Sequence, residues 1–167
     1  AQVPTRFTTA LLVEQAQLTA AALRNYWDIP APRLALCAFN PHASDGGLFG
    51  DEEERIMRPA LEQLRRENLV VSGPIPADTV FVRALEGEFD AVLAPYHDVG
   101  MAAFKTASFG LGVNVTLGLP FPRTSPDHGT ALDIAGQDRA DAGSMLEALE
   151  LAIRLAQAQQ HATVATR

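Results

Sequence analysis

Short apolar runs of strand length alternate along this chain with longer stretches of helical period, and this alternation restricts its fold more than any other feature. Apolar side chains recur every three or four positions over residues 8–28 and 142–160, which is the period of an amphipathic helix. Four apolar runs are predicted to be strands, at residues 33–39, 69–72, 90–94 and 112–117. Because strands that alternate with helices pair mainly in parallel, the sequence predicts a layered α/β/α domain with a largely parallel sheet.

The segments between these strands are predicted from their turn residues and charges. Shorter helices are expected over residues 51–66, 78–85 and 101–108, with Pro59 kinking or restarting the first of them. Residues 118–139 have polar loop chemistry, and we expect a loop there. A length of 167 residues suits one compact domain, so a single α/β domain is expected.

Composition excludes several classes of protein. The formal net charge is −7, so the chain lacks the positive excess with which proteins neutralise a nucleic-acid backbone. Charged residues interrupt every apolar stretch before it reaches membrane-spanning length. The lone cysteine, Cys37, cannot form an internal disulfide, and its apolar strand predicts an inert buried thiol. We therefore expect a cytoplasmic protein that binds neither nucleic acid nor membrane.

Three of the four histidines, His42, His97 and His128, lie in loops that follow predicted strands, the position at which open parallel sheets bind ligands. His42 comes after the first predicted strand and His97 after the third. Asp45 and Asp98 lie near them in the sequence and could orient their imidazoles as metal ligands. Two histidines make an incomplete site, because a metal with an open position takes about three protein ligands. The alternative is that both histidines cap turns by hydrogen bonding to nearby backbone.

A second set combines a cation, an amide and a cation at intervals of nine residues, namely Lys105, Asn114 and Arg123. This mixture suits a small anionic substrate, because arginine offers a planar fork of donors, lysine a compact charge and asparagine both a donor and an acceptor. Alternatively, Lys105 is only the solvent-facing residue of an apolar helix. Asn114 lies inside an apolar strand, where a buried amide must find partners.

A third segment, residues 127–136, contains groups that a nucleotide loop needs. Gly129 and Thr130 can bring backbone amides and a hydroxyl close to a ligand. His128 can stack on or hydrogen-bond to an adenine, and Asp133 can accept a hydrogen bond from a ribose hydroxyl. The sequence has no G-x-G-x-x-G after a strand and no Walker loop, so composition alone favours a polar turn before a helix.

Seven motifs occur here in the order in which one family has them. They are Asn40-Pro41-His42-Ala43 with Gly46-Gly47, Gly73-Pro74-Ile75-Pro76-Ala77-Asp78-Thr79, Tyr96-His97-Asp98, Lys105, Val113-Asn114-Val115-Thr116-Leu117-Gly118-Leu119-Pro120-Phe121, Arg123-Thr124-Ser125 and Asp127-His128-Gly129-Thr130-Ala131. Over residues 33–155 the chain resembles the C-terminal half of the 4-hydroxythreonine-4-phosphate dehydrogenase family. Residues 128–136 also resemble the adenine-side loop of isocitrate and isopropylmalate dehydrogenases, whose fold this family shares.

The resemblance implies a reaction and its cofactors. It implies NAD-dependent oxidation of 4-hydroxythreonine 4-phosphate beside a divalent metal, with decarboxylation, in pyridoxal phosphate (vitamin B6) biosynthesis. His42 and His97 fall on two of the family's three metal-ligand histidines, for Zn, Co, Ni, Mn or Mg. A homodimer with active sites shared across its interface is also implied.

The resemblance further implies roles for single residues. Lys105, Asn114 and Arg123 fall on substrate-contacting positions. Lys105 would stabilise the developing alkoxide or enolate, with Asp98 orienting the site. The four residues expected to contact NAD are His128, Gly129, Thr130 and Asp133.

The chain departs from the family at its start and at two motif positions. Residues 1–8 contain no histidine where the family's third metal ligand is expected, so the chain is expected to be the C-terminal portion of a longer two-domain dehydrogenase. Asp45 stands where the family often has Glu, and Val99 where it often has Gln. One alternative is therefore a relative that oxidises another phosphorylated hydroxy acid or an aromatic cis-dihydrodiol. Another is a catalytically silent dimerisation or ligand-binding fragment.

Overall fold

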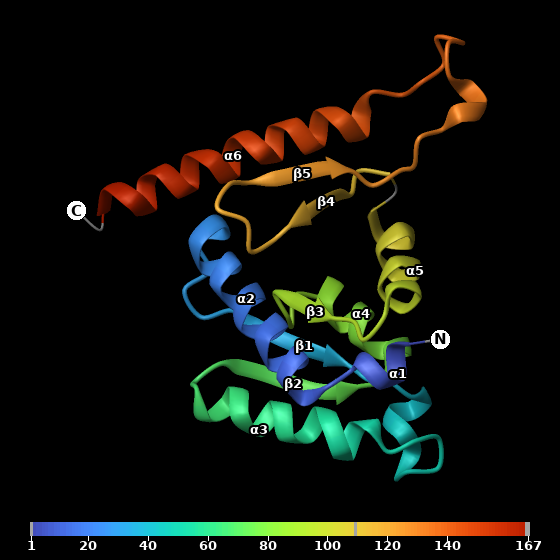
Figure 1. The fold of residues 1–167 in the computed structure, drawn as a ribbon, viewed down its shortest axis with the longest axis vertical. Helices are drawn as coiled ribbons and strands as arrows, with labels where there is room; N and C mark the ends of the chain where they lie inside the picture. Colours follow the sequence, from blue (N-terminus) through green and yellow to red (C-terminus); the bar gives the residue numbers. More distant parts are fainter. Residues whose placement is uncertain (1, 109, 166–167) are drawn as a thin grey trace. The chain divides into compact units, whose positions relative to one another are not determined.

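The structure, a computed structural model, describes residues 2–108 and 110–165, with side chains up to residue 160. These residues form two compact units (Figure 1). Unit 1 comprises residues 1–24 and 28–103, and unit 2 comprises residues 25–27 and 104–167. Each unit has its own sheet, and the single domain expected from the sequence stays a prediction.

The sheet of unit 1 has three parallel strands in the order β2-β1-β3. The central strand, β1 (Arg33–Cys37), pairs with β2 (Val70–Ile75) on one side and with β3 (Ala91–Leu93) on the other. Asp90 fixes the start of this pairing, because its carboxylate accepts from the Arg33 backbone N–H at 2.7 Å and from its guanidinium at 2.8 and 3.1 Å. The parallel sheet predicted from the sequence is confirmed in this unit.

Helices cover both faces of this sheet. Leu34 of β1 packs into a core cluster with α2 (Thr9–Trp27) and α3 (Arg58–Arg66). Ala35, the next residue, packs on the opposite face with α4 (Ala77–Leu85). Because successive side chains of a strand point to opposite faces, one apolar run can serve both cores. The predicted α/β/α layering is therefore present.

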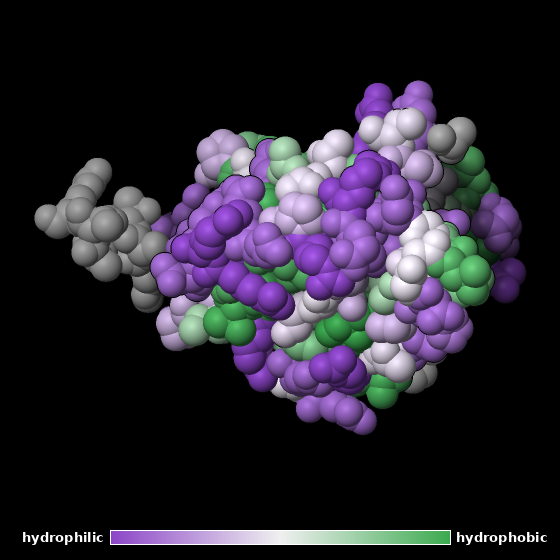
Figure 2. All heavy atoms as spheres, turned by 90° about the horizontal axis from the view of Figure 1, so that it is seen from below, coloured by the Kyte–Doolittle hydropathy of each residue, from purple (hydrophilic) through white to green (hydrophobic). Residues whose placement is uncertain are grey.

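Residues 51–66 form two helical elements, and the second begins beside Pro59, where the sequence predicts a kink or a restart. A π-helical turn, η2 (Glu53–Met57), leads into α3, and Pro59 occupies the first turn of α3, where its missing N–H breaks no helical bond. The face on which α3 lies is turned to the viewer in Figure 2, and hydrophilic side chains predominate on it. This is typical of a helix that buries one side only.

Unit 2 is a two-stranded antiparallel ribbon packed on a long helix. The ribbon consists of β4 (Val113–Thr116) and β5 (Arg123–Pro126), and the helix is α6 (Gly143–Ala165). The Thr124 hydroxyl donates to the Ala148 carbonyl of α6 at 2.7 Å, which ties one face of the ribbon to the helix. A short 3-10 helix, η3 (Leu132–Ile134), lies between β5 and α6.

Several expectations from the sequence are wrong in detail. Residues 118–139 are not all loop, because β5 lies among them and pairs with β4, which therefore does not join the parallel sheet. Strand β2 does not stop before Gly73 but continues to Ile75. At Gly73 a Cβ atom would lie 2.7 Å from the Leu36 carbonyl oxygen, so only glycine allows this close approach of β2 to β1.

The remaining helices are short or begin earlier than predicted. Helix α5 runs over His97–Ser108 rather than from residue 101, and helix α1 over Val3–Arg6. A single turn, η1 (Pro41–Asp45), follows β1. None of the helices in the described part of the chain combines the length and apolar content needed to cross a lipid bilayer.

Candidate functional site

A cavity of about 250 Å³ opens at the carboxyl end of the parallel sheet in unit 1. His42 lines it from the turn after β1, Asp78 from the first turn of α4, and Tyr96 from the segment between β3 and α5. Each comes from a segment that follows a different strand of the sheet. Ligands of open α/β sheets bind at this edge, so the cavity is the candidate site of unit 1.

His42 lies on a turn with an uncommon backbone. The φ angles of His42, Ala43, Ser44 and Asp45 are 53°, 53°, 67° and 45°, all in the left-handed region. A left-handed conformation costs a residue with a side chain about 1–2 kcal/mol, so the surrounding contacts must hold this turn. Gly47 and Phe49 provide some of them, because their N–H groups donate to the Ser44 carbonyl at 3.0 and 3.2 Å.

The carboxylates near the two histidines behave differently. His97 is the first residue of α5, not part of a loop, and its Nδ1 lies 2.9 Å from Asp98 Oδ1. This contact engages the Nδ1 atom of an imidazole that is 79% exposed, and metal binding by His97 stays a prediction. No hydrogen bond joins Asp45 to His42 in the described structure, and the His42 ring instead lies 6.4 Å from the Phe49 ring.

The imidazoles of His42 and His97 are suitable donors for a divalent metal, but they do not form a complete set. Within residues 2–108 and 110–160, no group of three or more histidine, cysteine, aspartate or glutamate side chains is arranged to hold a metal ion. The two-histidine metal site therefore stays a prediction.

In unit 2, the hairpin brings Asn114 and Arg123 to one face of the ribbon. Asn114 pairs with Ser125, and Arg123 pairs with Thr116, whose hydroxyl accepts from the Arg123 guanidinium at 2.8 Å. These four residues alternate with Thr124, which faces α6, so they lie on the face directed away from that helix. Asn114 is exposed rather than buried, because a two-stranded ribbon covered by one helix keeps one face open.

Lys105 forms an ion pair that the sequence analysis did not identify. Its ammonium contacts the Asp127 backbone carbonyl and lies 3.0 Å from the Asp127 carboxylate, whose side chain is only 5% exposed. The Lys105 cation, together with the Ser144 hydroxyl, holds the pKa of the Asp127 carboxyl below its usual range. Lys105 is therefore a fixed cation rather than a freely moving surface lysine.

The residues expected to contact NAD lie together on the exposed segment between β5 and α6. The Nδ1 atom of His128 lies 2.9 Å from the Gly129 carbonyl, and Thr130 follows directly. Asp133 lies in η3, and its backbone carbonyl accepts from the Gln137 amide at 2.7 Å. The Asp133 carboxylate has an exposed position, as contact with a ribose hydroxyl would require.

Three acidic residues beside these sites were not predicted from the sequence. Asp78 opens the helix after the Gly73-Pro74-Ile75-Pro76 motif, Asp127 precedes His128, and Glu53 belongs to an acidic run that we assigned to a helix start. The motif positions of Asp78 and Asp127 were a signal, whereas Glu53 lies in none of the motifs and only the structure shows what its carboxylate contacts. Cys37 behaves as predicted, because burial raises the pKa of its thiol to about 11.

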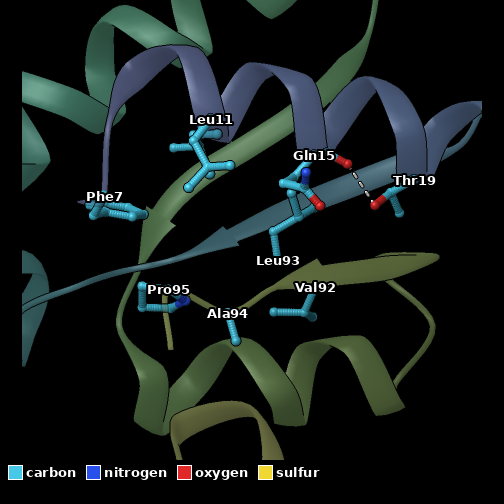
Figure 3. A pocket seen from close by; sticks show the side chains of 9 residues that line it. Phe7, Leu11, Gln15, Thr19, Val92, Leu93, Ala94 and Pro95 are labelled. Carbon is cyan, nitrogen blue, oxygen red and sulfur yellow. Dashed lines mark hydrogen bonds between the residues drawn. The ribbon is translucent and has the colours of Figure 1, made fainter. Parts of the chain in front are cut away.

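A second cavity in unit 1, of about 310 Å³, lies between α2 and the edge strand β3 (Figure 3). Phe7 and Leu11 line it from the helix side, and Leu93 and Pro95 from the strand side. Its polar lining side chains, Gln15 and Thr19, belong to one helix, where the Thr19 hydroxyl donates to the Gln15 carbonyl at 2.8 Å. Without an ionisable group, this cavity is not the candidate site.

Comparison with protein-family models matches residues 1–152 to the family of the pyridoxal phosphate biosynthetic protein PdxA. The 4-hydroxythreonine-4-phosphate dehydrogenase of Paracoccus denitrificans is 50% identical over 155 residues, which are 93% of this chain and 48% of that protein. The chain therefore spans about half the length of the curated relatives that it matches.

Solved structures similar to this chain are also dehydrogenases. The crystal structure of the 4-hydroxythreonine-4-phosphate dehydrogenase from Klebsiella pneumoniae superposes with a TM-score of 0.80 at 42% identity, covering 95% of this chain and 47% of that one. A terephthalate 1,2-cis-dihydrodiol dehydrogenase from Burkholderia xenovorans superposes with a TM-score of 0.71 at 29% identity, covering 92% of this chain and 48% of that one.

Proposed function

Because the chain belongs to the PdxA family, we propose that it is the C-terminal portion of an NAD-dependent and divalent-metal-dependent 4-hydroxythreonine-4-phosphate dehydrogenase. The observation that carries this proposal is the family match over residues 1–152, a range that includes every candidate site residue from His42 to Asp133. Oxidation with decarboxylation would serve pyridoxal phosphate biosynthesis, and the enzyme would act in the cytoplasm.

Unit 1 would supply metal ligands. His42 at the cavity and His97 at the start of α5 carry the imidazoles, and Asp98 fixes the His97 ring through the 2.9 Å contact to Nδ1. When bound, a divalent ion lowers the pKa of a coordinated hydroxyl and polarises the carbonyl formed from it. The family resemblance implies a third ligand besides these two histidines.

Unit 2 would bind the substrate through its charged and amide groups. The Arg123 guanidinium, steadied by Thr116, presents remaining donors to a phosphate or carboxylate, and Asn114 lies on the same face of the ribbon. The Lys105 ammonium, held by Asp127, would stabilise negative charge that develops on the substrate oxygen. Lys105 thus acts as an electrostatic group whose position is set by Asp127.

The exposed segment before α6 would bind NAD. The His128 ring can stack on or hydrogen-bond to the adenine, while the amides of Gly129 and Thr130 lie on the same exposed turn. The Asp133 carboxylate would accept from a ribose hydroxyl.

A homodimer with shared active sites is part of the proposal, and α6 carries a surface suited to it. Met145, Leu149 and Ile153 recur at intervals of four residues and are 56%, 56% and 51% exposed, with Leu146 beside them at 56%. A stripe of four large apolar side chains on one helix is typical of a protein interface. Leu149→Glu should therefore convert a dimer to a monomer in analytical ultracentrifugation.

Binding and turnover of defined compounds test the proposal. We expect calorimetry to detect NAD binding and, in the presence of Mn²⁺, binding of 4-hydroxythreonine 4-phosphate, and NADH absorbance to rise when both are present. His97→Ala should abolish the metal-dependent part. Absence of binding of both compounds to the wild-type chain would contradict the proposal.

The similarity to a terephthalate 1,2-cis-dihydrodiol dehydrogenase favours a second candidate, the oxidation of an aromatic cis-dihydrodiol. Val99, which lines the His42 cavity, is an apolar group compatible with an aromatic ring. NADH formation with the dihydrodiol, and none with 4-hydroxythreonine 4-phosphate, would select this candidate.

A further inference from the structure

Glu53 is the one buried ionisable side chain of unit 1 among the described residues, apart from the Cys37 thiol, and it has no role in the function proposed above. Its side chain is 2% exposed, although it belongs to a run of four acidic residues at the start of a helix. A buried carboxylate is costly unless its oxygens are hydrogen-bonded. Its partners therefore show what it does.

Within the described residues, the Glu53 carboxylate accepts hydrogen bonds from Phe39 and Asn40. Its Oε1 atom accepts from the Phe39 N–H at 2.9 Å and from the Asn40 N–H at 2.7 Å, and its Oε2 atom accepts from the Asn40 side-chain amide at 2.9 Å. Just before this point, at the end of β1, the Ala38 N–H donates to the Ile75 carbonyl of β2 at 2.8 Å. Glu53 thus binds the chain where it leaves the sheet.

The segment that Glu53 holds leads directly to His42. Pro41, with its restricted φ angle, is the only residue between Asn40 and His42. The left-handed turn begins at His42 itself. The direction in which the backbone leaves Asn40 therefore determines where the His42 imidazole lies.

The Glu53 carboxylate also contacts the Asn40 side chain, at which the two ends of the loop of residues 40–50 meet. The Asn40 side-chain amide also donates to Glu52 at 2.7 Å. The loop returns to this point at Gly50, where a Cβ atom would lie 2.6 Å from the Asn40 amide nitrogen. The two ends of the loop formed by residues 40–50 therefore meet at the Asn40 side chain, which also donates to Glu53.

Glu53 is also connected to the segment that carries His97. The Phe39 ring, whose backbone N–H it binds, stacks on Phe7 with centroids 5.1 Å apart and meets Tyr96 edge-on at 6.2 Å. Tyr96 immediately precedes His97. One carboxylate therefore acts on the anchors of both histidine-bearing segments.

We propose that Glu53 is a positioning residue, which holds the turn after β1 through the amides of Phe39 and Asn40 and so places the His42 imidazole for metal binding. This inference rests on the proposed function, because it assumes that His42 binds a metal. Glu53 itself does not touch the metal.

Glu53→Gln tests this inference with little change in shape. Whichever way its amide is turned, the NH₂ group of glutamine faces either the Asn40 side-chain amide or the two backbone N–H groups, so at least one donor loses its acceptor. Glu54→Gln is the matched control, because Glu54 is 61% exposed and pairs with Arg58 on the helix surface.

The measurement is a Zn²⁺ titration followed through the imidazole nitrogen signals of His42 and His97 by NMR. We expect the Zn²⁺ concentration needed to shift the His42 signals to rise by about tenfold or more in Glu53→Gln, with no change in Glu54→Gln. An unchanged titration in Glu53→Gln would overturn the inference.

A metal-free measurement separates this inference from the proposed function. The carbon chemical shifts of Ala43 and Ser44 report the left-handed turn, and they should move toward ordinary values in Glu53→Gln alone. If Zn²⁺ fails to shift His42 in the wild-type chain, the metal role fails, while these shifts still decide the role of Glu53.

A second variant covers the case in which Glu53→Gln does not fold. Asn40→Ala removes one of the three donors and keeps both backbone amides, so the same changes should appear with smaller size. Wild-type Zn²⁺ binding and wild-type turn shifts in this variant would also overturn the inference.

Discussion

Each unit holds a buried carboxylate beside its candidate site residues, but the partners of the two carboxylates differ. In the part of the chain that the structure describes, the Glu53 carboxylate of unit 1 accepts from uncharged N–H groups, two of them on the backbone. Asp127 in unit 2 faces the Lys105 ammonium, which is about half exposed. Salt and pH act on an exposed ion pair more strongly than on bonds to neutral amides. The turn that carries His42 in unit 1 is therefore held through neutral amides, whereas Lys105 in unit 2 is held by an ion pair.

The two units also differ in how many faces of their sheets are covered by helices. The central strand of unit 1 is covered by helices on both faces, whereas the ribbon of unit 2 packs on one helix and leaves the face with Asn114 and Arg123 open. A closed core suits metal ligands that must hold a fixed geometry. An open face suits groups that must reach a substrate.

The largest difference is expected in stability. Leu36→Ala removes a fully buried side chain of β1 and should lower the free energy of unfolding by about 2–5 kcal/mol. Val115→Ala on the half-buried ribbon should cost about 1 kcal/mol. Urea unfolding followed by circular dichroism measures both values, and equal losses would show that the two cores do not differ.

Arg123→Ala should weaken substrate binding without affecting NAD binding or the Zn²⁺ binding of unit 1. Loss of the guanidinium should weaken binding of 4-hydroxythreonine 4-phosphate by about tenfold, as expected when a charged hydrogen bond is lost. Binding of NAD should stay unchanged in the same calorimetric experiment, and so should Zn²⁺ binding to unit 1. A greater loss of NAD affinity than of substrate affinity would place Arg123 in the cofactor site instead.

The acid sensitivity of unit 2 should depend on Asp127. Lys105 lowers the pKa of the Asp127 carboxyl in the folded chain, so the ion pair stabilises unit 2 fully above the ordinary value of 3.8. That stabilisation is lost as the pH falls through the lowered value. In Asp127→Asn, amide exchange of β4 and β5 should be faster at neutral pH and less dependent on acid. Asp138→Asn, at an exposed loop position, should keep the wild-type profile.

The smallest effect is expected at Cys37. With a pKa raised to about 11 by burial, its thiol is protonated near neutral pH and should not react with an alkylating reagent in the folded chain. Reaction should begin only in urea, together with the loss of unit 1 structure. Rapid labelling without urea would show that the core of unit 1 opens more easily than its packing indicates.

The alternating pattern of the sequence was sufficient to predict the layers of unit 1, because its strands are buried on both faces and read as continuous apolar runs. The ribbon was not predicted, since Arg123-Thr124-Ser125-Pro126 contains no apolar pattern and is a strand only through its pairing with β4. Strand pairing is set by contacts between distant residues, which a single local pattern does not contain.

The candidate site residues were identified from motifs, but the contacts that hold them in place were not predicted. Lys105 and Glu53 each belong to a segment with a simple surface interpretation, namely an exposed helix position and an acidic helix start. Their partners, Asp127 and Asn40, lie 22 and 13 residues away along the chain. Only folding brings such pairs together.

The central claim is that His42 and His97 bind a divalent metal, and Zn²⁺ binding by the corresponding alanine variants tests it most directly. Calorimetry should show Zn²⁺ binding to the wild-type chain and to His128→Ala, and a loss of at least tenfold in affinity in both His42→Ala and His97→Ala. Equal Zn²⁺ affinity in all four proteins would contradict the account.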